Sequence, residues 1–218
     1  MKILKTIIAI AILSISCSKE EDVPVIIPEP QVEDTTLKLP ATFTNNIRTA
    51  LFDGNNNSPE LGITESQITL DKDGIIKRSS LISIQIDLSH DNANDISVVL
   101  VAPDGASCTL IKRIDGATVL FVTGNILDFN SQYPNAIPTD ASIPPNQAQF
   151  VSAGKYKPTF GSNPSPMQVA ILPTMSNFFY NKNIKGIWKL KIYDSNSSFI
   201  GTLNSWSIKI VNGAFEEL

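Results

Sequence analysis

Hydrophobic and polar residues alternate along several short segments of the chain. Isoleucine or leucine occupies every second position from 82 to 88, and serine, glutamine and aspartate lie between them. The same period of two recurs at 188–192 and at 206–210, where each segment also contains a tryptophan. Because successive side chains of a strand point to opposite faces, each segment predicts a β-strand with one buried and one solvated face.

Further strands are predicted between these segments. The nearly continuous apolar run 96–101 is typical of a central strand that is covered on both faces. A Pro-Asp-Gly turn at 103–105 follows, and then strands at 107–111 and 119–123. We expect the lysines on the polar faces of the C-terminal strands to lie in solvent and to oppose edge-to-edge pairing.

Little helix is expected anywhere in the chain. The stretch 128–149 is rich in proline, asparagine and aspartate and predicts loops. The one helix candidate, 167–180, is interrupted by Pro173, so at most a short helical turn is expected there. Many short strands with Gly and Pro turns predict an all-β sandwich or barrel.

The N-terminus has the layout of a secretory signal peptide, predicted for residues 1–16. Two lysines precede an apolar run at 7–13, which is too short to span a bilayer. Cys17 follows Ser16 and resembles the lipidated cysteine of a bacterial lipoprotein, although Ser14 stands where that motif usually has leucine. The alternative is a plain signal peptide cut near Ser16, which leaves Cys17 without a role.

Residues 17–38 predict a lipidated N-terminus and a tether. The acidic cluster at 20–22 resembles the surface-export tag of Bacteroidota lipoproteins, and a solvated linker is the alternative. Three prolines then favour an extended, semi-rigid chain. The resemblance implies a lipid-anchored protein of the bacterial outer membrane, exposed at the cell surface, whose membrane contact is the lipid on Cys17.

Charge and cysteine content exclude several classes of protein. The chain has 17 Lys and Arg against 21 Asp and Glu, and the signal peptide would remove two of the lysines. This acidic balance argues against a nucleic-acid partner, which requires a basic face. With Cys17 lipidated, Cys108 has no partner for a disulfide, and a cysteine-based zinc site is excluded. We expect Cys108 to be a small packed residue, with a reactive thiol as the alternative.

Three groups of motifs carry a family resemblance. They are the strand and turn segments 84–90 and 95–105, the Gly-Lys-Tyr-Lys-Pro segment 154–158, and the two tryptophan strands 186–194 and 201–208. Together they resemble the P domain (P/Homo B) of kexin-like proprotein convertases and of bacterial subtilisin-like proteases, over about residues 60–212. The resemblance implies a jelly-roll β-sandwich, galactose-binding-like, of about eight strands, and the predicted domain is 39–218.

Several motif residues have a structural explanation that requires no catalysis. The two tryptophans are large core anchors whose indole N–H groups need carbonyl partners. Gly105 and Gly201 are expected at turns that need an unusual φ. The motif residues interpreted in this structural way are His90, Pro103, Gly105, Trp188, Gly201 and Trp206.

The sequence predicts no enzymatic activity. In the family that it resembles, the P domain follows a subtilisin-like catalytic domain, which we do not find here. His90 is the one histidine available as a triad base, and its neighbour Asp91 points the other way along an extended chain. No Gly-x-Ser-x-Gly motif occurs. A family-level serine endopeptidase activity would describe the usual fusion partner, whereas a glycosidase-like carboxylate pair stays open.

A calcium site is a further possibility that the resemblance raises. Some bacterial P domains hold Ca²⁺ near these loops, and Asp91, Asp95 and Asp194 are the matching acids. Calcium needs six to eight oxygen ligands. Phe199 stands where the family often has another acid, which removes one candidate ligand. The alternative is that these aspartates cap turns.

Three functions compete at this stage. The leading hypothesis is a non-catalytic surface module for binding, adhesion or assembly at the bacterial envelope. The second is an accessory factor that stabilises or regulates a separate subtilisin-like serine endopeptidase. The third is a carbohydrate-binding jelly roll, which would need exposed aromatic residues; the candidates, of which 178–180 could instead be loop packing, are Tyr133, Tyr156, Phe178, Phe179 and Tyr180.

Overall fold

A computed structural model describes residues 37–54, 62–112, 119–137, 149–158 and 174–216. The chain divides into two units, Met1–Asp34 and Thr35–Leu218. The predicted signal peptide, Cys17 and the tether up to residue 36 lie outside the described residues.

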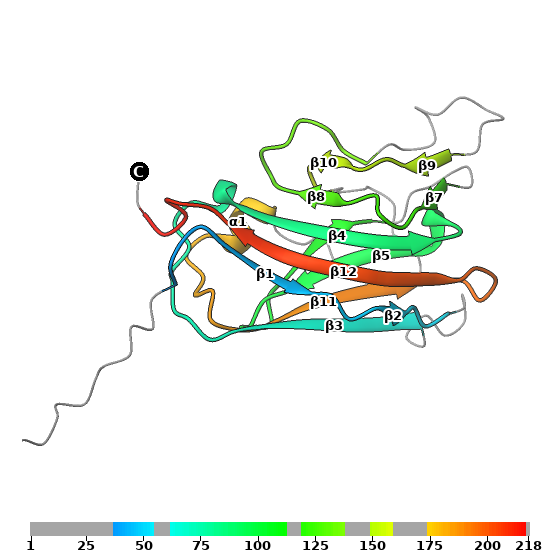
Figure 1. Cartoon of the computed structure of the whole chain (residues 1–218), viewed down its shortest axis with the longest axis horizontal. Helices are drawn as coiled ribbons and strands as arrows, with labels where there is room; N and C mark the ends of the chain where they lie inside the picture. The colour runs from blue at the N-terminus through cyan, green and yellow to red at the C-terminus, as the bar shows by residue number, and fades with distance from the viewer. Residues whose placement is uncertain (1–36, 55–61, 113–118, 138–148, 159–173, 217–218) are drawn as a thin grey trace, which may run out of the picture. The chain divides into compact units, whose positions relative to one another are not determined.

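The second unit is built from two β-sheets (Figure 1). The four-stranded sheet has the order β3 (Ile63–Leu70), β11 (Gly186–Asp194), β5 (Ile96–Val101) and β6 (Ser107–Ile111). The eight-stranded sheet runs in the order β1 (Ala41–Asn45), β12 (Gly201–Ile210), β4 (Ile82–His90), β7 (Val119–Phe121) and β9 (Gln149–Val151). The remaining strands of this sheet are β2 (Thr49–Ala50) beside β12, β8 (Leu127–Phe129) beside β4, and β10 (Gly154–Tyr156) beside β8.

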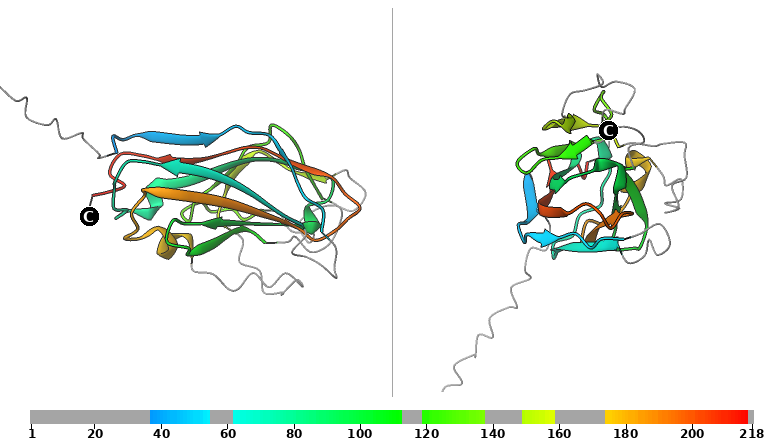
Figure 2. Two further views of the ribbon diagram at one scale, coloured as in Figure 1. Left: turned by 90° about the horizontal axis from the view of Figure 1, so that it is seen from below. Right: turned by 90° about the vertical axis from the view of Figure 1, so that its right-hand side faces the viewer.

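The two sheets stack face to face, as the end-on view in Figure 2 shows. The all-β class and the sandwich are therefore confirmed. The described residues contain twelve strands rather than about eight. The strands for which no segment was predicted are β1, β2, β3, β8, β9 and β10, four of which have only two or three residues. The jelly-roll connectivity stays a prediction.

The core lies between the sheets and follows the period of two in the sequence. The even-numbered residues of β4 from 82 to 88 are at most 1% exposed, and so are Trp206, Ile208 and Ile210 of β12. From the other sheet, Trp188 and Leu190 contribute fully buried side chains. Each such side chain stabilises the fold by roughly 1.5–3 kcal/mol when it is fully buried.

Both tryptophans satisfy their indole N–H groups, but only Trp188 does so with a carbonyl, as predicted. Trp188 Nε1 donates to the carbonyl of Ile184 at 2.7 Å. Trp206 Nε1 donates to Ser66 Oγ at 2.9 Å, so this bond links the two sheets through the core. A buried donor without a partner would cost about 1–3 kcal/mol, so these two bonds make the tryptophans specific to their positions.

The helical content is small, as expected. Besides the 3₁₀ turns η2 (Ser79–Leu81) and η3 (Ala93–Asp95), the described residues contain the five-residue helix α1 (Met175–Phe179), whose first turn is capped by Thr174. No helix in the described part of the chain is both long and apolar enough to cross a membrane.

Cys108 is a packed core residue of β6. It is fully buried, and this burial raises the pKa of its thiol to about 12. Because the thiolate is the reactive form, the high pKa favours the structural interpretation over a reactive thiol.

Candidate functional site

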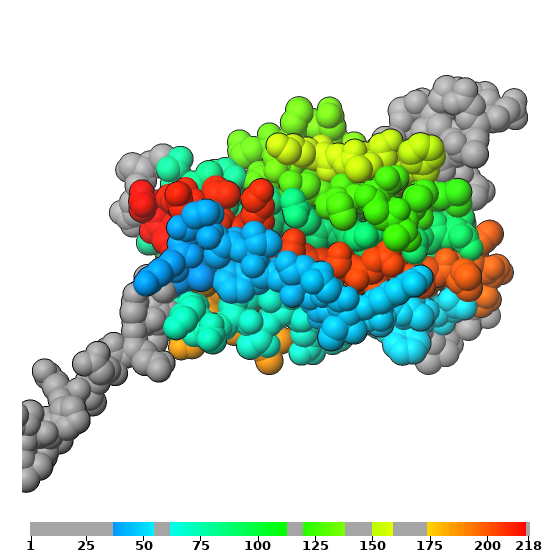
Figure 3. Space-filling model, viewed as in Figure 1, coloured from blue at the N-terminus to red at the C-terminus, as the bar shows by residue number. Residues whose placement is uncertain are grey.

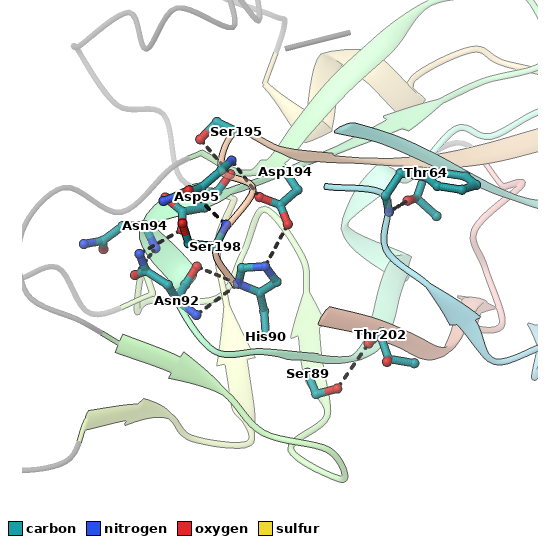
Figure 4. Close-up of polar contacts among 12 residues, drawn as sticks. Thr64, Ser89, His90, Asn92, Asn94, Asp95, Asp194, Ser195, Ser198 and Thr202 are labelled. Atoms are coloured by element: carbon teal, nitrogen blue, oxygen red, sulfur yellow. Dashed lines mark hydrogen bonds and ion pairs between the residues drawn. The ribbon is translucent and has the colours of Figure 1, made fainter. Parts of the chain in front are cut away.

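A buried histidine–aspartate pair joins the two sheets at one end of the sandwich (Figure 4). His90 is the last residue of β4, and Asp194 is the last residue of β11. His90 Nε2 lies 2.9 Å from Asp194 Oδ2, and the two residues are 1% and 0% exposed. A buried ion pair whose polar atoms are satisfied holds its two elements in one relative position.

The other ring nitrogen of His90 faces the backbone of Asn92. His90 Nδ1 is 3.0 Å from the amide nitrogen of Asn92 and 2.7 Å from its carbonyl oxygen. A neutral Nδ1 accepts from the N–H, whereas a protonated Nδ1 donates to the carbonyl. Both ring nitrogens therefore have partners in either protonation state.

Burial and charge act in opposite directions on His90. Burial lowers the pKa of His90, whereas the hydrogen bond and the charge of Asp194, the Asn92 backbone and the charge of Asp95 raise it. Burial is the largest single effect, but the raising effects together outweigh it, so the pKa of His90 lies above its ordinary value. The carboxylate partner thus favours the imidazolium form inside the protein.

The loop after β4 is locked to the loop after β11. Asn92 Nδ2 donates to Asp95 Oδ2 at 2.8 Å, and the carbonyl of Asp95 accepts from Ser195 N at 3.0 Å and Ser195 Oγ at 3.2 Å. Asp194 Oδ1 accepts the amide of Asn196 at 3.0 Å. These bonds show that Asp95 and Asp194 organise turns, which was the alternative to metal binding.

Three glycines let the backbone approach this cluster closely. A Cβ on Gly201 would overlap the imidazole of His90, and a Cβ on Gly54 or Gly62 would overlap the carbonyl of Asp194. Gly105 has φ +84°, as expected for its turn, but Gly201 is not among the positive-φ residues. The expectation of an unusual φ at Gly201 is therefore wrong, and close packing against His90 is the reason for glycine there.

The predicted calcium ligands do not come together as a cation site. Asp91 is exposed, whereas Asp95 and Asp194 are buried and point into hydrogen bonds with Asn92, His90 and Asn196. Among the described residues, no group of three or more His, Cys, Asp and Glu side chains has an arrangement suited to a metal ion. The residues as arranged do not fit Ca²⁺, which needs several free carboxylate oxygens.

The structure also separates the five aromatic candidates for sugar binding. Phe178 and Phe179 are at most 1% exposed and contact the ring of Trp188, with centroids 6.1 and 5.6 Å away. Tyr156 is 7% exposed and Tyr180 is 61% exposed, while Tyr133 is half-buried. The five rings therefore form no joint exposed row, and 178–179 are core residues.

Sequence reasoning missed Asp194 as the partner of His90, although a signal was present. The inward positions of β4 continue in steps of two to His90, and those of β11 continue from Trp188 to Asp194. Both polar residues therefore extend an inward-facing row. Polar residues at inward-facing positions predict burial with polar partners, although the pattern does not say which residues pair.

The family comparison agrees with the resemblance over part of the chain. Residues 148–210 match the family model of the proprotein convertase P-domain. This range includes both tryptophan strands and Asp194, and it ends at the last residue of β12. No curated protein gives a significant match to the chain.

Several solved structures are similar to this chain at low identity. The serine protease of Aeromonas sobria is 16% identical with a TM-score of 0.37, and the match covers 80% of this chain and 28% of that chain. For the complex of that protease with the chaperone ORF2, the identity is 17% and the TM-score 0.34, and the match covers 81% of this chain and 28% of that chain. For the VP2 subviral particle of infectious bursal disease virus, the identity is 13% and the TM-score 0.33, and the match covers 82% of this chain and 34% of that chain. The chain thus spans about a third or less of these structures.

Proposed function

We propose that this chain is a non-catalytic binding module of the P-domain type, held at the bacterial outer membrane by a lipid on Cys17. The P-domain match and the β-sandwich support the kind of module. The signal-peptide pattern before Cys17 and the acidic residues after it support the anchor.

The observation that supports a non-catalytic role is that both ring nitrogens of the buried His90 already have partners. A histidine that acts as a general base needs one ring nitrogen within reach of a nucleophile or of water. His90 is 1% exposed, and its nitrogens face Asp194 and the backbone of Asn92. The pair resembles two members of a triad in composition, but its geometry is that of a bridge between sheets.

A serine-hydrolase assay tests this proposal directly. The purified full chain is incubated with a fluorophosphonate probe, which labels activated serines, and with casein. We expect no labelling and no digestion, both for the wild type and for His90→Gln. Labelling that His90→Gln abolishes, in a variant that still folds by circular dichroism, would show that His90 is a catalytic base.

The lipid anchor has its own test. Metabolic labelling with a radioactive fatty acid should mark the wild type, and Cys17→Ser should lose the label and leave the membrane fraction. Cys108→Ser is the matched control: Cys108 is buried, so its replacement should leave the labelling unchanged. Digestion of intact cells by added protease should remove the wild-type domain if it is exposed at the surface.

The family match favours one second candidate, an accessory factor for a separate serine endopeptidase. The model that matches residues 148–210 is named for the proprotein convertases, in which the module accompanies a protease. Co-purification of a subtilisin-like protease with the intact lipoprotein would support this role. A chain that purifies alone and leaves the stability of such a protease unchanged would contradict it.

A further inference from the structure

A small pocket with a mixed polar and apolar lining lies on the outer face of the eight-stranded sheet, at the end of β4 opposite His90. Its volume is about 160 Å³. Figure 3 shows this face, on which β12 in red, the start of β4 in teal and the segment after β8 in light green lie side by side. The lining of the pocket includes the polar residues Ser83, Gln132 and Lys209, and Leu81, Tyr133 and Val211 contribute apolar surface.

The floor of the pocket belongs to the rigid sheet. Ser83 of β4 is 7% exposed and pairs across the strands with Lys209 of β12. Asn130 follows β8, and its Nδ2 donates at 2.8 Å both to the carbonyl of Ser80 and to that of Ile82. Its Oδ1 accepts the amide of Gln132 at 2.8 Å. The pocket is therefore preorganised, which lowers the entropy cost of binding.

Tyr133 forms an aromatic wall in a fixed orientation. Its amide donates to the carbonyl of Asn130 at 3.2 Å, and its hydroxyl donates to Asp128 Oδ2 at 3.3 Å. Lys155 Nζ lies 5.4 Å from the centre of the ring. An aromatic ring held in this way offers apolar surface beside polar groups, the usual composition of a small-molecule site.

Lys209 supplies a free positive charge next to this wall. It is exposed and has no acidic residue within ion-pair distance in the described part of the chain. Lysines that do form ion pairs there include Lys182, Lys185, Lys189 and Lys191. An unpaired ammonium beside hydroxyl and amide groups is suited to a ligand that carries one carboxylate and several hydroxyls.

We propose that this pocket binds a single carboxylate-bearing pyranose unit, such as a uronic acid of a polysaccharide. The ring of the sugar packs against Tyr133, its carboxylate pairs with Lys209, and its hydroxyls bond to Gln132 and to Ser83, whose side chain also hydrogen-bonds to that of Tyr133. A volume of about 160 Å³ has room for one sugar ring and is below the roughly 300–1,000 Å³ of sites for larger ligands. The inference rests on the proposed binding function and names a ligand class and a site for it.

Titration of the purified full chain with three small probes tests the chemistry. The probes are methyl β-D-glucuronide, methyl β-D-glucoside and acetate, and binding is followed by saturation-transfer NMR. We expect the glucuronide to bind about tenfold more tightly than the glucoside, from one charge-assisted hydrogen bond. Acetate should bind least, because it lacks the ring and the hydroxyls.

Two variants locate the site. Lys209→Gln should reduce glucuronide affinity about tenfold and leave the glucoside unchanged. Tyr133→Ala should abolish the saturation signals of both sugars. The matched controls are Lys38→Gln, which removes another exposed lysine, and Tyr180→Ala, which removes a tyrosine that is 61% exposed elsewhere. Neither control should change binding.

Several outcomes would overturn the inference. Acetate that binds as tightly as the glucuronide would indicate a plain carboxylate site, for which a peptide C-terminus is the natural ligand. Equal binding of both sugars, no binding, or loss of binding in the control variants would also contradict it. None of these results affects the proposed non-catalytic function, whereas hydrolysis of the glucuronide by the chain would contradict that function and leave the site intact.

Discussion

The two ends of strand β4 carry polar clusters of opposite character. At the C-terminal end, His90 and Asp194 are buried, and His90 has a partner at each ring nitrogen. At the N-terminal end, Ser83 lies beneath Tyr133 and Lys209, next to an open pocket. The first cluster has the residue types of catalysis but is buried, and the second has no catalytic motif but borders an open pocket with the exposed Lys209.

The difference teaches that residue type alone does not locate function in this fold. A buried polar pair costs desolvation energy and contributes mainly to a unique arrangement of the sheets. An exposed lysine without a partner contributes almost nothing to the fold and is available to a ligand. The C-terminal end of β4, with the buried pair, is called the closed end, and the N-terminal end, with the pocket, is called the open end. The closed end should therefore govern stability, and the open end should govern binding.

The largest expected effect is at the closed end. Asp194→Ala leaves His90 Nε2 and the amide of Asn196 without partners in a buried site, so we expect a loss of about 3–5 kcal/mol in the free energy of unfolding. Urea unfolding measures it. Asp91→Ala, which truncates an exposed aspartate of the adjacent loop, should change stability by less than about 0.5 kcal/mol. Equal losses of stability in Asp194→Ala and Asp91→Ala would contradict the claim that the buried pair stabilises the fold.

A steric change at the same end should have the next largest effect. Gly201→Ala places a Cβ against the imidazole of His90 and a methyl group of Leu51, so we expect a loss of about 1–3 kcal/mol. Ser205→Ala on the same strand adds no atom to the core and should be nearly neutral. A Gly201→Ala variant as stable as the wild type would show that the cluster packs loosely.

The stability of the protein should depend on pH through His90. Because the folded protein raises the pKa of His90, the imidazolium contributes stability that is fully present below its ordinary value of about 6.5. This contribution is lost as the pH rises through the raised pKa. Urea unfolding between about pH 5 and pH 9 should show the decline in the wild type. A decline of the same size in His90→Gln would assign it to other groups.

Changes at the open end should leave stability almost unaltered. Lys209→Gln and Tyr133→Phe remove a free charge and one 3.3 Å hydrogen bond to Asp128, so each should change the free energy of unfolding by less than about 1 kcal/mol. Thermal melts and urea unfolding measure both. A large destabilisation by Lys209→Gln would show that the lysine has a structural role and is not reserved for a ligand.

The smallest expected effect is that of a chelator. The aspartates predicted as calcium ligands are exposed or occupied by hydrogen bonds, so removal of divalent cations should leave the melting temperature unchanged. A bound ligand raises stability by mass action. A melting temperature that rises with added Ca²⁺ and falls with chelator would restore the calcium hypothesis.

The fold was more predictable than either cluster. Period two identified β4, β11 and β12, and the apolar run at 96–101 identified β5, five of whose six residues are buried. The three-residue strands β8, β9 and β10 were not predicted, because so short a segment has no measurable period. Tertiary pairing, and not local sequence, makes them strands.

The clusters depend on residues that are far apart in the chain. His90 and Asp194 are 104 positions apart, and the pocket joins segments near 83, 132 and 209. Their meeting is set by the order of strands in the sheet, which residue patterns do not specify. The sequence showed only that His90 and Asp194 each continue a row of inward-facing positions in steps of two. This pattern indicates burial without naming the partner.

The position of β12 has a consequence for how the protein folds. It is the last strand in the chain, yet it lies between β1 and β4, and its register covers Ala41–Asn45 on one side and the whole of β4 on the other. The edges of β1 and β4 that face β12 therefore stay unpaired until about residue 210 has been made. Such non-local pairing predicts folding in milliseconds to seconds, after synthesis of the domain rather than during it.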